Sequence, residues 1–132
     1  MKKLALPLII LALVFVSCKK QAENKLNGTW NVVKTSDFLG EEFSWEFSEN
    51  GKLKVTYPNY PAVITEARYE IVNKNMKNHI RISGLDSMIN NFEPMNADWQ
   101  ILKLNKSQLK IAHDKPTAQG QGKGLVYREF IR

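Results

Sequence analysis

The stretch 43–57, FSWEFSENGKLKVTY, decides the fold of this chain. On both sides of its centre, apolar residues alternate with polar ones, so each half has one apolar and one polar face. Such alternation is typical of antiparallel strands that cover a single core. Asn50-Gly51 at the centre favours a tight hairpin turn, because Asn and Gly accept the positive φ angles of such turns. The stretch therefore predicts a β-hairpin.

The same alternation recurs from residue 29 onwards and predicts eight strands. Their expected ranges are 29–35, 42–48, 52–57, 64–72, 79–83, 98–104, 108–114 and 124–132. The sixth and eighth strands alternate less regularly, which we interpret as β-bulges. Closing eight antiparallel strands into a barrel removes the exposed edges that invite aggregation. We therefore predict an all-β fold, an eight-stranded antiparallel up-and-down barrel.

The connections between these strands differ at the two ends of the predicted barrel. The short ones, at the tight end, are 49–51, 73–78 and 105–107. The longest connection, 84–97, lies at the other end between the fifth and sixth strands. Four of its apolar residues have the spacing of one helix face: Leu85, Met88, Ile89 and Phe92. We predict one short helix there, which forms either a lid over a cavity or a plug that seals a filled barrel.

The start of the chain has the layout of a secretory signal peptide. A basic beginning, residues 1–3, precedes the uncharged run 4–16, as in exported proteins. The run is shorter than the roughly 18 apolar residues that a spanning helix needs. Residues 15–18, FVSC, resemble a bacterial lipobox, in which the cysteine is lipidated after cleavage. The resemblance implies a diacylglyceryl group on Cys18, the lipidation site.

This resemblance divides the chain into three parts. They are a cleaved lipoprotein signal peptide 1–17, a lipidated tether 18–25 and a barrel domain 26–132. Two or more acyl chains, such as palmitate, anchor a protein stably to a membrane. By analogy with sorting in Gram-negative bacteria, Lys19 after the cysteine implies the outer membrane. The tether lysines either contact anionic headgroups or belong to a solvated spacer.

Charge and residue types exclude several functions. The net charge is +6, yet residues 26–132 carry only 14 basic and 12 acidic residues, and no basic stretch indicates a nucleic-acid partner. A single cysteine makes neither an internal disulfide nor a structural zinc site. Neither His79 nor His113 stands at metal-ligand spacing, and we expect His113 to face inward at the end of its strand, as a core or rim histidine. We expect no metal, no cofactor, no catalytic residue and no enzymatic activity.

Gly28-Thr29-Trp30, at the start of the first strand, resembles the Gly-x-Trp signature of lipocalins. Lipocalins also place an Arg of the last strand against that Trp, in a cation–π contact. Arg128 is the expected counterpart, and Arg132, further along the same face, is the alternative. Over residues 26–132 the chain resembles the compact lipocalin-like domains of bacterial lipoproteins. The resemblance implies that Gly28, Trp30 and Arg128 form a structural signature and that the barrel binds a small apolar molecule.

We expect the inward side chains to line a cavity for a small hydrophobic ligand. They are Trp45, Leu53, Val55, Tyr57, Tyr69, Ile82, Met88, Phe92 and Ile111. The alternative is a solid barrel that acts as a protein-interaction module, such as an enzyme inhibitor or an envelope-assembly subunit with an envelope protein as partner. In either case we expect a monomer held on the membrane by its N-terminal lipid.

Overall fold

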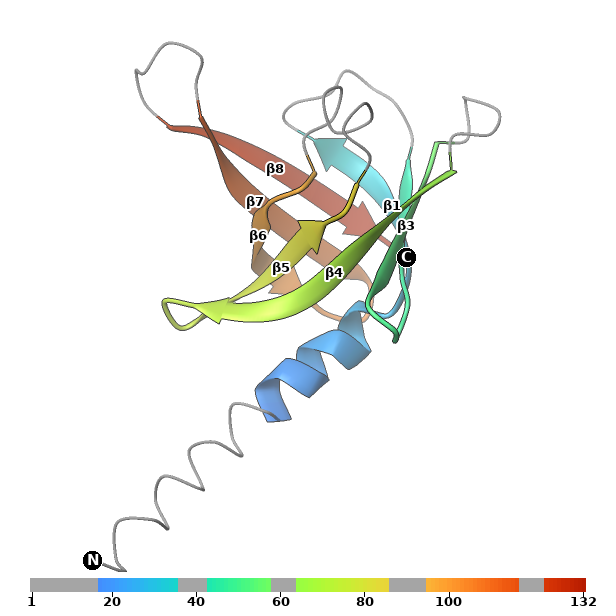
Figure 1. The fold of residues 1–132 in the computed structure, drawn as a ribbon, viewed down its shortest axis with the longest axis horizontal. Coiled ribbons are helices and arrows are strands. Elements are labelled where there is room, and N and C mark those ends of the chain that lie inside the picture. Colours follow the sequence, from blue (N-terminus) through green and yellow to red (C-terminus); the bar gives the residue numbers. More distant parts are fainter. Residues whose placement is uncertain (1–16, 36–42, 58–63, 86–94, 117–122) are drawn as a thin grey trace, which may run out of the picture.

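Eight strands close into an antiparallel barrel in which each strand pairs with its neighbours in the sequence and β8 pairs with β1 (Figure 1). The computed structural model describes residues 17–35, 43–57, 64–85, 95–116 and 123–132. The strands are β1 (Gly28–Thr35), β2 (Ser44–Phe47), β3 (Lys52–Thr56), β4 (Ile64–Lys74), β5 (Lys77–Ser83), β6 (Asp98–Leu104), β7 (Gln108–Pro116) and β8 (Lys123–Ile131). The predicted all-β class and the closed eight-stranded barrel are confirmed.

Register shifts occur in two strands, of which the sequence predicted one. In β6 the pairing with β7 shifts between Ile101 and Lys103, as the mixed alternation indicates. The second shift lies in β1, between Val32 and Lys34. The prediction of a bulge in β8 is wrong, because β8 pairs with β7 without interruption from its first to its last residue. A bulge adds one residue to a strand and so changes which side chains meet across it.

The helix that the structure describes is not the predicted one. Residues 17–26 are helical and lie against one end of the barrel (Figure 1). This segment was expected to be a tether, yet Ala22 and Leu26, four residues apart on one helix face, are buried in the core. Lys19 and Glu23 form an ion pair of 4.0 Å on the outer side. The helix predicted within the 84–97 connection falls on residues 86–94, outside the described residues.

Three tight turns lie at the same end as the helix. The β2–β3 turn uses Gly51 with a φ of 76°, and its carbonyl accepts a hydrogen bond of 2.8 Å from the Tyr69 amide. The β4–β5 turn uses Asn75 and Met76, with φ angles of 51° and 62°. The β6–β7 turn is held by Asn105, whose Oδ1 accepts a bond of 2.8 Å from the amide of Gln108. We call the helix 17–26, these turns and Arg132 together the helix end of the barrel.

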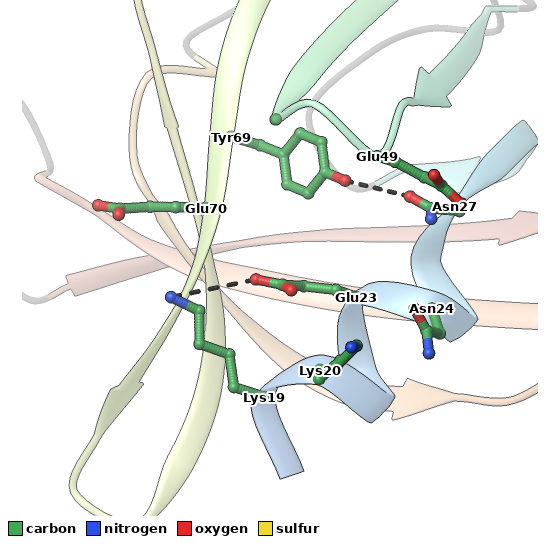
Figure 2. Close-up of a pocket in the computed structure, with 9 residues that line it drawn as sticks. Lys19, Lys20, Glu23, Asn24, Asn27, Glu49, Tyr69 and Glu70 are labelled. Atoms are coloured by element: carbon green, nitrogen blue, oxygen red, sulfur yellow. Dashed lines mark hydrogen bonds and ion pairs between the residues drawn. The ribbon is translucent and has the colours of Figure 1, made fainter. Parts of the chain in front are cut away.

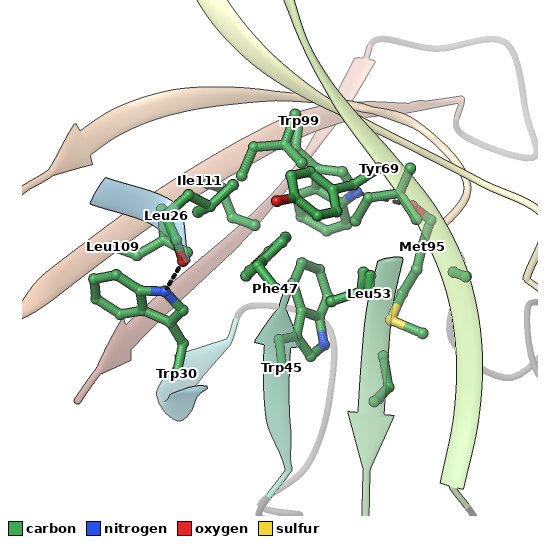
Figure 3. Packing of buried hydrophobic residues seen from close by; sticks show 14 of the residues in the cluster. Leu26, Trp30, Trp45, Phe47, Leu53, Tyr69, Met95, Trp99, Leu109 and Ile111 are labelled. Atoms are coloured by element: carbon green, nitrogen blue, oxygen red, sulfur yellow. Dashed lines mark hydrogen bonds between the residues drawn. The ribbon is translucent and has the colours of Figure 1, made fainter. Parts of the chain in front are cut away.

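The strand face that alternation marked as apolar points into the barrel. Its side chains form one buried cluster with contributions from every strand, and Leu26 of the helix joins it at the helix end (Figure 3). The largest fully buried members are Trp30, Trp45, Trp99, Phe47 and Phe130. Burial of this much aromatic surface is the main favourable term in the stability of a small barrel.

Candidate functional site

The side chains predicted to line a ligand cavity all point into the barrel where the structure describes them. Trp45, Leu53, Tyr69 and Ile111 belong to the buried cluster (Figure 3). Val55 and Ile82 belong to it as well, and Tyr57 packs against it half-buried. Met88 and Phe92 lie outside the described residues. The structure therefore brings the described members of this set together in the barrel interior, packed against one another.

Trp45 lies at the centre of this interior. Its ring packs against Phe47 and Phe130, with centroid distances of 6.0 and 5.0 Å. It also meets Trp99 edge-on at 5.9 Å and Phe43 at 6.5 Å. Edge-to-face and tilted pairs of this kind contribute roughly 0.5–1.5 kcal/mol each beyond their buried area. The rings contributed by β2, β6 and β8, together with Phe43, thus form one aromatic cluster.

A buried cation lies within the aromatic cluster. Arg128 of β8 has no exposed surface, and its guanidinium carbon lies 5.3 Å from the Phe43 and Trp45 ring centroids and 4.8 Å from that of Trp99. A cation over aromatic faces gains electrostatic energy, most strongly where water is excluded. The contact predicted between Arg128 and Trp30 is wrong, because Arg128 lies beside Thr35 of β1 and Ile111 of β7.

The cation over Trp30 is Arg132, whose guanidinium carbon lies 4.3 Å from the ring centroid. The same guanidinium donates hydrogen bonds to the backbone carbonyls of Lys25, Asn27 and Lys106. Gly28 has a φ of 115°, and a Cβ there would lie 3.1 Å from the guanidinium. Glycine at this position therefore gives both the backbone angle and the room that Arg132 needs. The Gly28, Trp30 and Arg132 cluster ties the helix to the first and last strands.

The indole N–H groups of the three tryptophans differ in their partners. Trp30 donates to the Leu26 carbonyl at 2.7 Å, and Trp99 donates to the Met95 carbonyl at 2.9 Å. Trp45 Nε1 is buried and has no hydrogen-bond partner among the described residues. Most buried polar atoms are hydrogen-bonded, so such an exception requires an explanation.

His113 of β7 provides a second buried polar atom of this kind. Its ring meets Trp99 edge-on at 4.2 Å, on the side of β7 that faces the interior. Nδ1 lies 2.9 Å from the carbonyl oxygen of Asp114. Because a carbonyl only accepts, Nδ1 carries a proton in this contact. Nε2 of the neutral ring is then an acceptor, and it is buried without a partner in the described part of the chain. The alternation indicated that His113 faces inward, but it did not indicate this unpaired nitrogen.

Two surface grooves flank the helix 17–26. One, of about 550 Å³, is lined by charged residues of the helix together with Glu49, Tyr69 and Glu70 (Figure 2). The Tyr69 hydroxyl donates to the Ser48 carbonyl at 2.8 Å and approaches Asn27 Oδ1 at 3.3 Å. Burial raises the pKa of Tyr69, and the negative charges of Glu23 and Glu49 raise it further. Charged and polar side chains line this groove, in contrast to the aromatic interior.

The second groove, of about 390 Å³, lies between the helix and strands β5 and β6. Cys18 lines it with a free, exposed thiol, beside Lys77 and Leu102. The predicted lipidation site thus lies at the helix end, on the surface of the barrel rather than in its interior.

A charged network lies on the outer wall of β4, β5 and β6. Asp98 accepts hydrogen bonds of 2.8 Å from both Arg81 and Lys74. These two donors hold the pKa of Asp98 well below its usual range. Arg81 also pairs with Glu70 at 3.4 Å. All charges of this network have partners, so it fits a structural role across three strands.

Within the described ranges, no three His, Cys, Asp or Glu side chains gather as metal ligands would. No helix in the part of the chain that the structure describes is long and apolar enough to cross a membrane. No protein-family model, curated protein or solved structure matches this chain. The barrel interior and the helix end are the two candidate functional regions of the described chain.

Proposed function

We propose that this chain is a lipid-anchored protein of the cell envelope whose lipocalin-like, up-and-down barrel binds a small hydrophobic molecule with one polar end. The observation that carries the proposal is the pair of unpartnered polar atoms, Trp45 Nε1 and His113 Nε2, in the aromatic interior. Both rings pack on Trp99, so the two residues adjoin the same part of the aromatic cluster.

The chemistry of these two atoms defines the polar end of the ligand. An indole N–H only donates, and Nε2 of a His113 ring that has its single proton on Nδ1 only accepts. A hydroxyl, an amide or a protonated carboxyl group both accepts and donates, and therefore suits the site. Leaving a buried polar group unpaired costs about 1–3 kcal/mol. A ligand that pairs with Trp45 Nε1 and His113 Nε2 recovers part of this free energy on binding.

The surrounding rings define the rest of the ligand. Phe43, Trp99 and the half-buried Tyr57 surround this region, and Phe43 and Tyr57 lie 5.8 Å apart. Such walls favour an apolar or aromatic body, as in most small-molecule sites, where a few polar groups fix the orientation. Ligand entry is expected at the end opposite the helix, because Leu26 and Trp30 are fully buried at the helix end.

The membrane anchor is supported by separate features. Residues 15–18, FVSC, resemble a lipobox. The Cys18 thiol is exposed, so a lipid attached to it would lie outside the core. Removal of residues 1–17 would leave Cys18 as the first residue of the helix. The outer membrane is the proposed location, on the analogy with lipoprotein sorting.

A second candidate function is supported by the dense packing of the interior. Trp45, Leu53, Val55 and Ile111 have no exposed surface. A barrel filled by its own side chains has no room for a ligand, and its outer surface would then contact a protein partner. The two candidates differ in whether the purified protein has one saturable site for an amphipathic molecule.

The test is a titration with a naphthylamine dye, followed by its displacement with medium-chain alcohols and amides. We expect one saturable site in the wild-type protein. Trp45→Phe removes the unpaired N–H together with part of the indole ring. It should therefore weaken alcohol binding by roughly 2- to 10-fold and also lower the free energy of unfolding, because the smaller ring leaves a void in the core.

Trp30→Phe is the matched control. It removes an N–H that is already bonded to the Leu26 carbonyl, so it should lower stability without changing ligand affinity. Absence of any saturable site would favour the solid barrel, and equal affinities of the wild-type and Trp45→Phe proteins would reject the proposed polar contact.

A further inference from the structure

Basic residues of this chain are concentrated at the helix end of the barrel. Nine basic residues belong to the helix, the three turns with their flanking positions, and Arg132. They are Lys19, Lys20, Lys25, Lys52, Lys74, Lys77, Lys103, Lys106 and Arg132, and all are exposed. Glu23 and Glu49 belong to the same segments, Glu70 lines the groove beside the helix, and Asp98 pairs with Lys74, so this end has a net charge of +5. From Cys18 onwards, the remaining residues comprise eight basic and nine acidic ones, a net charge of −1.

Contacts between these segments show that the basic residues share one surface. Arg132 binds the carbonyls of Lys25 and Lys106, which joins the helix to the β6–β7 turn. One groove is lined by Lys25, Lys77 and Lys103, from the helix, β5 and β6. Figure 1 shows the helix and the three turns on the same side of the barrel.

Exposed apolar side chains accompany the lysines. Met76, at the tip of the β4–β5 turn, is 89% exposed and stands between Lys74 and Lys77 in the sequence. Leu102 is 49% exposed in the groove that Cys18 also lines. Apolar side chains flanked by lysines are typical of surfaces that lie in a membrane interface, where the apolar part enters the headgroup region.

We infer that the helix end is a docking surface for an anionic lipid bilayer. The lysines bind headgroup phosphates, Met76 enters the interface, and the opposite end of the barrel points away from the membrane. Charge complementarity favours a bilayer, since basic residues close to an anionic surface are attracted within about a Debye length of 8–10 Å. A nucleic acid would satisfy the charges but leave Met76 and Leu102 exposed.

This inference rests on the proposed function in one respect: the proposed lipid anchor keeps the protein at the membrane. The charged surface itself does not require lipidation of Cys18. An anchor at Cys18 would place the helix end against the bilayer, because Cys18 lines the groove on this surface. The two features therefore favour the same orientation.

Chemical labelling of lysines tests this orientation. The full-length protein is purified in detergent, reconstituted into vesicles of phosphatidylglycerol or of phosphatidylcholine, acetylated briefly and analysed by mass spectrometry. In phosphatidylglycerol we expect Lys20, Lys77 and Lys106 to react roughly fivefold more slowly, and high salt should restore their reactivity. Lys34 and Lys54, on the walls of β1 and β3, are the internal controls and should react equally in both vesicles.

A charge-reversal pair gives a second measurement. Lys77→Glu with Lys106→Glu should abolish the protection of Lys20, whereas Lys34→Glu with Lys54→Glu should leave it unchanged. Circular dichroism checks that each variant is folded.

Equal labelling in both kinds of vesicle, or protection of Lys34 and Lys54 instead, would overturn the inference. Protection by duplex DNA without protection by anionic vesicles would also overturn it and assign the surface to nucleic acid. The mass of the N-terminal peptide reports lipidation separately, so a missing lipid would contradict the proposed anchor without deciding the orientation.

Discussion

Arg132→Ala should destabilise the barrel more than any other exposed substitution, because one guanidinium joins three segments. It lies 4.3 Å from the Trp30 ring centroid and donates to the carbonyls of Lys25, Asn27 and Lys106. Three hydrogen bonds and a cation–π contact at roughly 0.5–1 kcal/mol each give a loss of about 2–4 kcal/mol. For a domain of this size the melting temperature should fall by about 10 °C.

Urea unfolding, followed by tryptophan fluorescence, measures this loss. Arg132→Lys is the control, since it keeps the charge but cannot reach three carbonyls with a planar fork, and it should restore less than half of the stability. A double-mutant cycle with Trp30→Leu should give a coupling energy of about 0.5–1 kcal/mol. Additive effects of the two substitutions, or a loss below about 0.5 kcal/mol for Arg132→Ala, would mean that Arg132 does not join these segments energetically.

Three further predictions concern other parts of the chain. Cys18→Ser should abolish incorporation of a radioactive fatty acid, because the chain has one cysteine, and equal label in wild type and variant would contradict lipidation. Asp98→Asn should flatten the acid side of the plot of unfolding free energy against pH. The lowered pKa of Asp98 in the folded state stabilises the fold above pH about 4. This contribution of about 1 kcal/mol or less is lost as the pH falls towards the pKa of the folded state. Tyr69→Phe should flatten the alkaline side, because a raised pKa in the folded state stabilises below pH about 10 and is lost as the pH rises through the folded value. Unchanged urea midpoints across pH 3–5 or pH 9–12 between variant and wild type would reject the corresponding argument.

Local patterns predicted most of the strands and little of their long-range register. Alternation in 43–57 and the Asn50-Gly51 pair are local features, and the hairpin formed as expected. The residue facing Trp30 depends on pairing between the first and last strands. The shift between Val32 and Lys34 is part of that pairing. No local pattern in β8 distinguished Arg128 from Arg132.

The helix 17–26 was missed for a different reason. Its composition is almost entirely polar, and only Ala22 and Leu26 are buried. Two apolar residues give no recognisable period, so the segment was interpreted as a tether. The four-residue spacing of Lys19 and Glu23, and of Ala22 and Leu26, was the available signal.

The candidate site was predictable only in part. The alternation of apolar and polar residues predicted that Trp45 and the aliphatic side chains around it point into the barrel. It did not indicate that Trp45 lacks a hydrogen-bond partner, because partners of an indole N–H come from elsewhere in the chain. The basic surface was missed because its lysines are scattered in the sequence, although the predicted order of strands already placed the three short connections at one end.

Native mass spectrometry of the purified protein shows whether the barrel interior binds a ligand. We predict that the wild-type protein carries one non-covalent small molecule, or takes up one added medium-chain alcohol or amide, in a complex of one to one. The Trp45→Phe variant should retain less of it, and the Trp30→Phe variant should retain as much as the wild type. A wild-type protein that stays free of ligand in excess amphiphile would contradict the account.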